Sequence, residues 1–143
     1  MEQYLSMFID EAKEHLQAMN ENLLELEKEP ENLTIVQNIF RSAHTLKGMS
    51  ATMGFEDLAK LTHEMENVLD LVRNEKLKVN DFVFDALFQC FDHLEAMVED
   101  IVQGGGGQAD VSQIVSTLKA IVSGDYEKQS SGGAGGNRQS ANA

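Results

Sequence analysis

Apolar side chains recur at alternating spacings of three and four along the chain, which is the period of an amphipathic helix. The first such stripe predicts a helix over about residues 4–27: Leu5, Ile9, Ala12, Leu16, Met19, Leu23 and Leu26. Pro30, the only proline, marks the turn that follows. A second helix is predicted over about residues 33–52 by Val36, Ile39, Phe40, Ala43, Leu46 and Ser50, with Gly54 placed to end it.

Two more stripes complete the pattern. The third predicts a helix over about residues 56–74: Leu58, Leu61, Met65, Val68, Leu69 and Val72. The fourth follows a cap at Asn80 or Asp81 and consists of Phe84, Leu87, Phe88, Phe91, Leu94, Val98 and Ile101. Four amphipathic helices joined by short turns are typical of an antiparallel bundle, so we predict an all-α fold with a four-helix bundle over residues 1–103.

The chain changes character after the fourth stripe. Residues 104–109 begin with four glycines and predict a flexible connector. Asp110 is placed to cap a short fifth helix over residues 110–123, whose apolar face consists of Val111, Ile114, Leu118 and Ile121. Residues 124–143 are mostly Gly, Ser, Gln and Asn, a composition that predicts a flexible linker or, alternatively, an ordinary frayed terminus.

Charge and cysteine content narrow the class of protein. Eleven Lys and Arg against 24 Asp and Glu give a net charge of -13, which argues against nucleic acid or an anionic membrane as partner. Cys90 is the single cysteine, so no internal disulfide can form. No signal peptide and no run of membrane-spanning length is evident. We therefore expect a cytoplasmic protein without membrane insertion.

The segment His44-Thr45-Leu46-Lys47-Gly48 carries the candidate chemistry. Residues three and four apart are neighbours on a helix, so the Lys47 ammonium can reach a group attached to the His44 ring, and Gly48 leaves space beside it. On the third helix, Glu66 can accept a hydrogen bond from one imidazole nitrogen and leave the other as a nucleophile. His63 can add a second hydrogen bond or position that carboxylate. Such a cluster suits an imidazole that carries a phosphoryl group.

Other interpretations of these residues stay open at this point. A His, a Lys and a Glu on helices are more often plain surface residues, and the bundle can serve as a non-catalytic helical interaction module. A metal site is disfavoured, because the reversed His63-x-x-Glu66 spacing lacks carboxylates from the second helix. Cys90 lies among Phe88 and Phe91 and is expected in the core. The chain also lacks a glycine-rich ATP loop.

The sequence resembles the histidine-containing phosphotransfer (HPt) domains at the amino terminus of bacterial chemotaxis histidine kinases of the CheA family. The resemblance covers about residues 1–122 and rests on residues 4–12 (YLSMFIDEA), 40–48 (FRSAHTLKG), 53–55 (MGF) and 63–67 (HEMEN). It implies a five-helix domain in which His44 accepts the γ-phosphoryl group of ATP. Lys47 is then its cationic neighbour, Gly48 the space-making residue, and His63 and Glu66 its hydrogen-bonding partners.

The resemblance also implies partners and cofactors. ATP and Mg²⁺ are used by a separate kinase catalytic domain, often acting in trans, and none is bound by this chain. The phosphoryl group then passes to an aspartate of a response regulator of the CheY or CheB kind. The chain is expected to be part of a histidine protein kinase and a monomer in isolation. A free-standing phosphorelay protein is the alternative.

Overall fold

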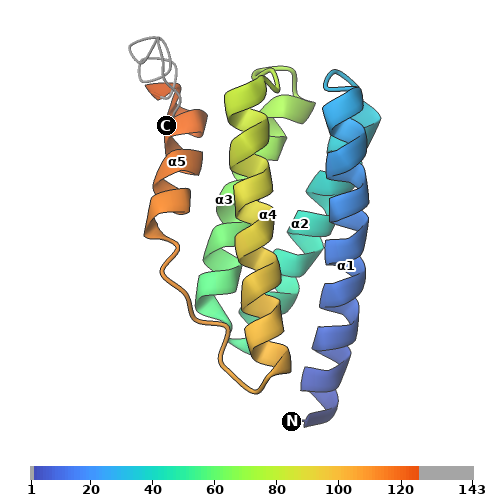
Figure 1. Cartoon of the computed structure of the whole chain (residues 1–143), viewed down its shortest axis with the longest axis vertical. Coiled ribbons are helices and arrows are strands. Elements are labelled where there is room, and N and C mark those ends of the chain that lie inside the picture. Colours follow the sequence, from blue (N-terminus) through green and yellow to red (C-terminus); the bar gives the residue numbers. More distant parts are fainter. Residues whose placement is uncertain (1, 126–143) are drawn as a thin grey trace.

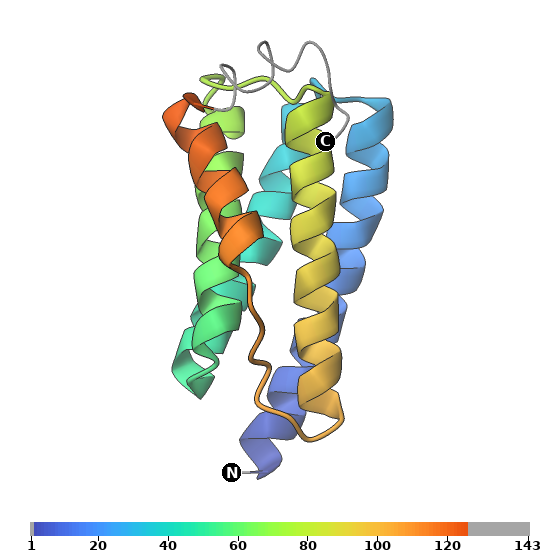
Figure 2. The same ribbon diagram turned by 60° about the vertical axis from the view of Figure 1, so that its left-hand side comes forward.

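A computed structural model of the chain describes residues 2–125, which form five helices. These are α1 (Glu2–Lys28), α2 (Leu33–Met53), α3 (Glu56–Arg73), α4 (Asp81–Val102) and α5 (Ser112–Ser123). Helices α1 to α4 run alternately up and down, and each packs against the next, with α4 closing back on α1 (Figure 1). The fifth helix lies outside this four-helix bundle and packs against α3 and α4 (Figures 1 and 2). The predicted antiparallel four-helix bundle with a short fifth helix is confirmed.

The bundle core is built from the predicted stripes. Its largest fully buried side chains are Met19, Leu23, Leu26, Ile39, Leu46, Leu58, Leu61, Met65, Leu69, Leu87, Leu94 and Met97. Each buried side chain of this size contributes roughly 1.5–3 kcal/mol relative to an exposed one. Five stripe residues are only half-buried at the margins of the core: Leu5, Ile9, Phe40, Phe84 and Phe88. The packing holds α2 and α3 rigidly side by side, and these two helices carry the candidate site.

Asparagine caps begin two of the helices, and a glycine ends one of them. Asn32 accepts from the backbone N–H groups of Thr34 and Ile35 at the start of α2, and Asn80 accepts from Val83 at the start of α4. Gly54 ends α2 with a φ of 81°, a conformation that favours glycine. The tight turn that follows sets α3 antiparallel to α2, so side chains about ten residues from the turn on either side meet across the pair.

The structure corrects the predicted cap of the fifth helix. Val111, not Asp110, occupies the cap position of α5, and no side chain caps it. Asp110 precedes it, and its Oδ1 accepts from the backbone N–H of Ser112 at 3.1 Å and from its hydroxyl at 2.6 Å. These bonds lower the pKa of the Asp110 carboxyl. The helix therefore begins at Ser112, one residue beyond the start that a cap at Asp110 implies, and the Asp110 carboxylate binds that first residue.

The glycine-rich connector, predicted to be flexible, makes two hydrogen bonds to side chains of the bundle. The Gly107 N–H donates to Asp100 Oδ2 at 2.9 Å, and the Ala109 N–H donates to Asp57 Oδ2 at 3.1 Å. Helix α5 then buries Ile114, Val115, Leu118 and Ile121. The predicted tail begins at residue 124, and its residues 126–143 lie outside the described part of the chain. Within residues 2–125, no helix is long and apolar enough to cross a membrane.

Candidate functional site

His44 lies on the outer surface of α2 beside the buried stripe. Its neighbours Ala43 and Leu46 are fully buried, whereas its own side chain is 60% exposed. A residue at the edge of a helical stripe has its backbone held by core packing while its side chain reaches solvent. The imidazole is therefore fixed at its base and accessible at its tip.

Glu66 reaches the His44 ring from α3. Its Oε2 lies 2.5 Å from His44 Nδ1, and its side chain is only 11% exposed. Its Oε1 is buried and lies 2.7 Å from Lys47 Nζ. The latter contact is an ion pair without the geometry of a directed hydrogen bond, and Oε1 has no other partner among the described residues. One carboxylate thus bridges two residues of α2.

The contacts of Glu66 keep it ionised. Burial by itself raises the pKa of this carboxyl, but the contact with Lys47 and the hydrogen bond with His44 outweigh burial. The net effect is a pKa below the ordinary value of 4.5. At neutral pH the group is therefore a carboxylate, which accepts hydrogen bonds and donates none.

An ionised Glu66 determines the tautomer of His44. Because the carboxylate oxygen can only accept, Nδ1 must carry the proton of the short bond. The lone pair of a neutral imidazole is then on Nε2, the nitrogen that Glu66 does not contact. The geometry leaves an exposed histidine with a defined nucleophilic atom.

Lys47 lies one turn along α2 from His44, at the spacing predicted. Its side chain is 28% exposed, and its ammonium is held by Glu66 Oε1. The cation is therefore anchored next to the imidazole yet reachable from solvent. A compact ammonium at this place suits the oxygens of an attached phosphoryl group.

His63 departs from the predicted arrangement. It is exposed on α3 and makes no hydrogen bond to His44 or Glu66 in the described part of the chain. It lines a shallow pocket with Lys47 and Gly48 instead. Since α2 and α3 are antiparallel, a residue one turn before Glu66 lies opposite Lys47 and Gly48, about 5 Å along the helix from His44. The hydrogen bond expected from His63 is thus not seen among the described residues, and its role in the site stays a prediction.

Gly48 leaves space on the outside of the molecule. A Cβ built at this position meets nothing within 4 Å, and the residue is exposed. The glycine is thus not required by packing within the bundle. The space beside His44 faces whatever approaches from solvent.

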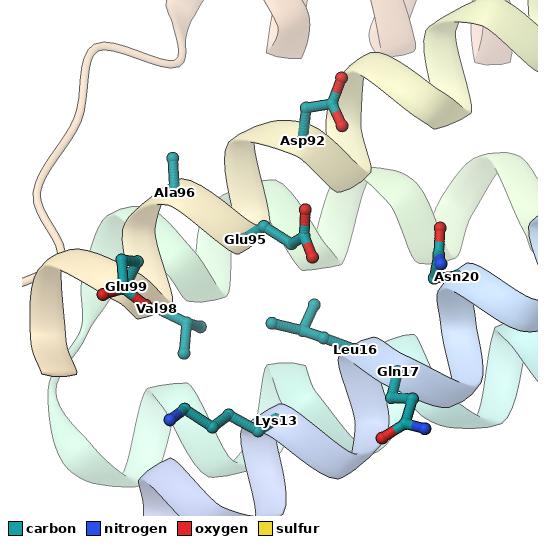
Figure 3. A pocket seen from close by; sticks show the side chains of 9 residues that line it. All are labelled: Lys13, Leu16, Gln17, Asn20, Asp92, Glu95, Ala96, Val98 and Glu99. Carbon is teal, nitrogen blue, oxygen red and sulfur yellow. The ribbon is translucent and has the colours of Figure 1, made fainter.

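A larger groove lies away from these residues, between α1 and α4 (Figure 3). It has a volume of about 700 Å³ and is lined by Lys13, Leu16, Gln17, Asn20, Asp92, Glu95, Ala96, Val98 and Glu99. None of the predicted site residues lines it. The larger groove therefore does not coincide with the candidate site around His44.

Two rival chemistries can be compared with the structure. Within residues 2–125, no group of three or more His, Cys, Asp or Glu side chains is arranged to hold a metal ion. Cys90 is fully buried, and burial raises the pKa of its thiol far above the usual range. A buried, protonated thiol is not a nucleophile.

Sequence reasoning missed two residues next to the site. Phe40 was assigned to the core, but its ring is nearly parallel to the His44 ring, with centroids 6.0 Å apart and an interplanar angle of 9°. Arg73, in the last turn of α3, places its guanidinium carbon 3.8 Å from the centroid of the Phe40 ring. The spacing of four between Phe40 and His44 is the signal that indicates their contact. No local pattern indicates Arg73.

Comparison with known proteins gives this site a family. The Hpt domain family matches residues 3–104, which include the bundle from the second residue of α1 onward and every residue of the site described above. The chain belongs to the Hpt domain family.

Relatives of this Hpt domain come from chemotaxis proteins. It is 58% identical over 123 residues to the chemotaxis protein CheA of Listeria monocytogenes, covering 86% of the chain and 20% of that protein. A solution structure of the histidine phosphotransfer domain of CheA matches with a TM-score of 0.77 and 43% identity, over 84% of this chain and 92% of that one.

A second solved structure is similar in fold. The phosphorylated P1 domain of CheA3 from R. sphaeroides, solved in complex with CheY6, matches with a TM-score of 0.77 over 86% of this chain and 98% of that one. At 23% identity this likeness concerns the fold. The chain spans about a fifth of the length of the curated relatives it matches.

Proposed function

We propose that His44 accepts the γ-phosphoryl group of ATP at Nε2 and passes it to an aspartate of a response regulator. The observation that carries the proposal is the 2.5 Å contact between Glu66 Oε2 and His44 Nδ1 on an imidazole that is 60% exposed. One nitrogen is bound to an ionised carboxylate, and the other is free to react. Membership of the Hpt domain family supports the same chemistry.

The first transfer needs no base, because His44 loses no proton when it is phosphorylated. The Nε2 lone pair attacks the γ-phosphorus, the bond from that phosphorus to the bridging oxygen breaks, and ADP leaves with the electron pair. The ring keeps its Nδ1 proton and becomes a phosphorylated imidazolium. Glu66 stabilises this cation through the hydrogen bond already in place, and Lys47 stabilises the charge on the phosphoryl oxygens.

In the second transfer, the His44 imidazole is the leaving group instead of the nucleophile. A carboxylate oxygen of the regulator's aspartate attacks phosphorus, the bond between phosphorus and Nε2 breaks, and the electron pair returns to the ring. Regulators of the CheY or CheB kind are the proposed acceptors. The complex of the P1 domain of CheA3 with CheY6 is an example of such a pairing in another protein.

ATP and Mg²⁺ belong, in this proposal, to a separate kinase catalytic domain that acts on the domain in trans. The chain contains no glycine-rich nucleotide loop, and its relatives are about five times longer. The chain is thus the phosphotransfer part of a histidine protein kinase and works in the cytoplasm, where ATP is available. Gly48 and His63 lie on the face that the kinase and the regulator approach.

A labelling experiment tests the proposal. The chain is incubated with the catalytic core of a CheA-type kinase and ATP labelled in the γ-phosphate. We expect label that is stable in base and released by acid, as for a phosphohistidine, and no label in His44→Gln. His93→Gln, a histidine outside the site, is the matched control and should be labelled like the native chain. Labelling of His44→Gln at the native rate would exclude His44.

A further inference from the structure

We infer that Phe40 and Arg73 are positioning residues that hold the His44 ring in its reactive orientation. The inference rests on the proposed function of His44 and adds two residues to it. Phe40 touches the imidazole, and Arg73 acts through Phe40.

The hydrogen bond to Glu66 does not by itself fix the imidazole. It holds the ring at Nδ1, whereas the direction of Nε2 also depends on rotation of the ring about that contact. His44 is 60% exposed and has little core packing to limit this rotation. In-line attack on phosphorus is sensitive to direction, and a misplacement of about 1 Å can lower a rate by roughly 100-fold. A second contact on the ring is therefore of use.

Phe40 supplies that contact. It precedes His44 by four residues on α2, so the two side chains are neighbours on one face of the helix. The rings are nearly parallel, at 9°, with centroids 6.0 Å apart. Because Phe40 is half-buried and packs against the core, its ring is held more firmly than an exposed side chain would be. It limits how far the imidazole can turn.

Arg73 holds Phe40 from α3. The guanidinium carbon lies 3.8 Å from the centre of the Phe40 ring, at the distance of a cation–π contact. Asp70 fixes the guanidinium through 2.8 Å contacts from Nε and Nη2 to its Oδ1, and Nη1 donates to Gln37 Oε1 at 3.4 Å. The arginine is thus anchored on both helices and cannot leave the ring freely.

These contacts continue the seam that contains the site. Along α2 the residues are Gln37, Phe40, His44 and Lys47, and along α3 they are Glu66, Asp70 and Arg73. Their spacings of three and four place each set on a single helix face. Glu66 binds His44 and Lys47 at one end of the seam, and Arg73 binds Phe40 and Gln37 at the other. Both ends therefore act on the same imidazole.

Substitution of Phe40 tests the inference. Phe40→Leu keeps an apolar side chain but removes the flat ring, and Phe40→Tyr keeps the ring. With the kinase catalytic core, we expect kcat for phosphorylation of Phe40→Leu to fall roughly tenfold with KM changed less than about twofold. Phe40→Tyr should restore kcat. Phe88→Leu, which removes a half-buried aromatic residue on α4, is the matched control and should behave like the native chain.

Nuclear magnetic resonance gives a readout that does not depend on phosphorylation. Long-range proton–nitrogen spectra of the His44 ring report the fraction of molecules with the proton on Nδ1. We expect this fraction to fall in Phe40→Leu and to recover in Phe40→Tyr. A native tautomer fraction and a native kcat in Phe40→Leu would overturn the inference.

Arg73 provides a second test if Phe40→Leu does not fold. The side chain is one-third exposed, so its removal spares the core. We expect Arg73→Ala to lower kcat about threefold, and Arg73→Lys to restore it incompletely, because an ammonium lacks the planar stacking of a guanidinium. Lys119→Ala, an exposed cation on α5, controls for net charge. Native kcat in Arg73→Ala would contradict the role of Arg73.

These results separate the two proposals. If the native chain takes no label on His44, the proposed function fails. If it is labelled and the Phe40 and Arg73 variants are labelled equally fast, the function stands and the positioning role fails.

Discussion

Glu66 Oε2 and His44 Nδ1 lie 2.5 Å apart, although the two residues are 22 positions apart in the chain and belong to different helices. The contact exists because Gly54 turns the chain sharply and sets α3 antiparallel to α2. The same carboxylate binds Lys47 through its other oxygen. The orientation of the His44 ring therefore depends on a contact from another helix and not on α2 alone.

Replacing Glu66 should slow phosphorylation of His44. In Glu66→Gln the size is kept, but the charge that fixes the tautomer and stabilises the imidazolium is lost. Carboxylates that orient metal-bound histidines are worth roughly 10–100-fold in activity, and we expect a loss of that order here. The initial rate of labelling by the kinase catalytic core measures the effect, with Glu95→Gln, an exposed carboxylate on α4, as control. Equal rates in Glu66→Gln and the native chain would remove Glu66 from the mechanism.

The lowered pKa of Glu66 makes part of the stability dependent on pH. A carboxyl whose pKa is lower in the folded chain than its unfolded value near 4.5 stabilises the fold above that value. This contribution is lost as the pH falls through the folded pKa. Urea unfolding gives the free energy of unfolding of the native chain and of Glu66→Gln between neutral and acidic pH. The difference between the two free energies should become smaller below pH 4.5. A difference that does not change with pH contradicts the assigned pKa.

Gly48 and Gly107 should respond oppositely to alanine. At Gly48 a Cβ meets nothing, so Gly48→Ala should raise the unfolding free energy by about 0.5–1 kcal/mol through helix propensity. At Gly107 the φ is 69° and a Cβ would lie 2.7 Å from Ile101 Cδ1, so Gly107→Ala should lower it by about 1–3 kcal/mol. Chemical denaturation measures both variants.

The Gly48→Ala variant should nevertheless transfer phosphoryl groups more slowly, because the added methyl group lies on the face proposed above for the approach of the kinase and the regulator. Gly107→Ala, in the connector between α4 and α5, should keep the native rate in the folded fraction. Native transfer rates in Gly48→Ala would show that the space beside His44 is not used.

Cys90 should be inert until the bundle unfolds. It is fully buried between core residues, and its pKa is raised by burial. We expect a thiol reagent to modify the native chain roughly 100-fold or more slowly than the chain in denaturant. Rapid modification under native conditions would contradict the packing of α4.

Most of the bundle could be predicted from the sequence because its helices have regular apolar stripes and few breakers. The stripe of α3 is buried throughout, and Gly54 ends α2 as expected. Glu66 was predicted to face His44 because each flanks the stripe of its own helix. These features depend on local spacing, which the sequence contains directly.

Features that depend on the exact register between helices were not predictable. His63 and Glu66 are one turn apart on α3, and only the register decides which of them reaches His44. The contact of Arg73 with Phe40 spans two helices and has no local pattern. The hydrogen bonds of the connector were not predictable either, since its glycines give no sign that Asp57 and Asp100 accept from its backbone.

Identifying the His44 nitrogen that becomes phosphorylated tests this mechanism most directly. Long-range proton–nitrogen and phosphorus spectra of the labelled, phosphorylated chain identify that atom on His44. Because Nδ1 is bound to Glu66, the phosphoryl group should be on Nε2, with the Nδ1 proton retained. A phosphoryl group on Nδ1 would contradict the role assigned to Glu66.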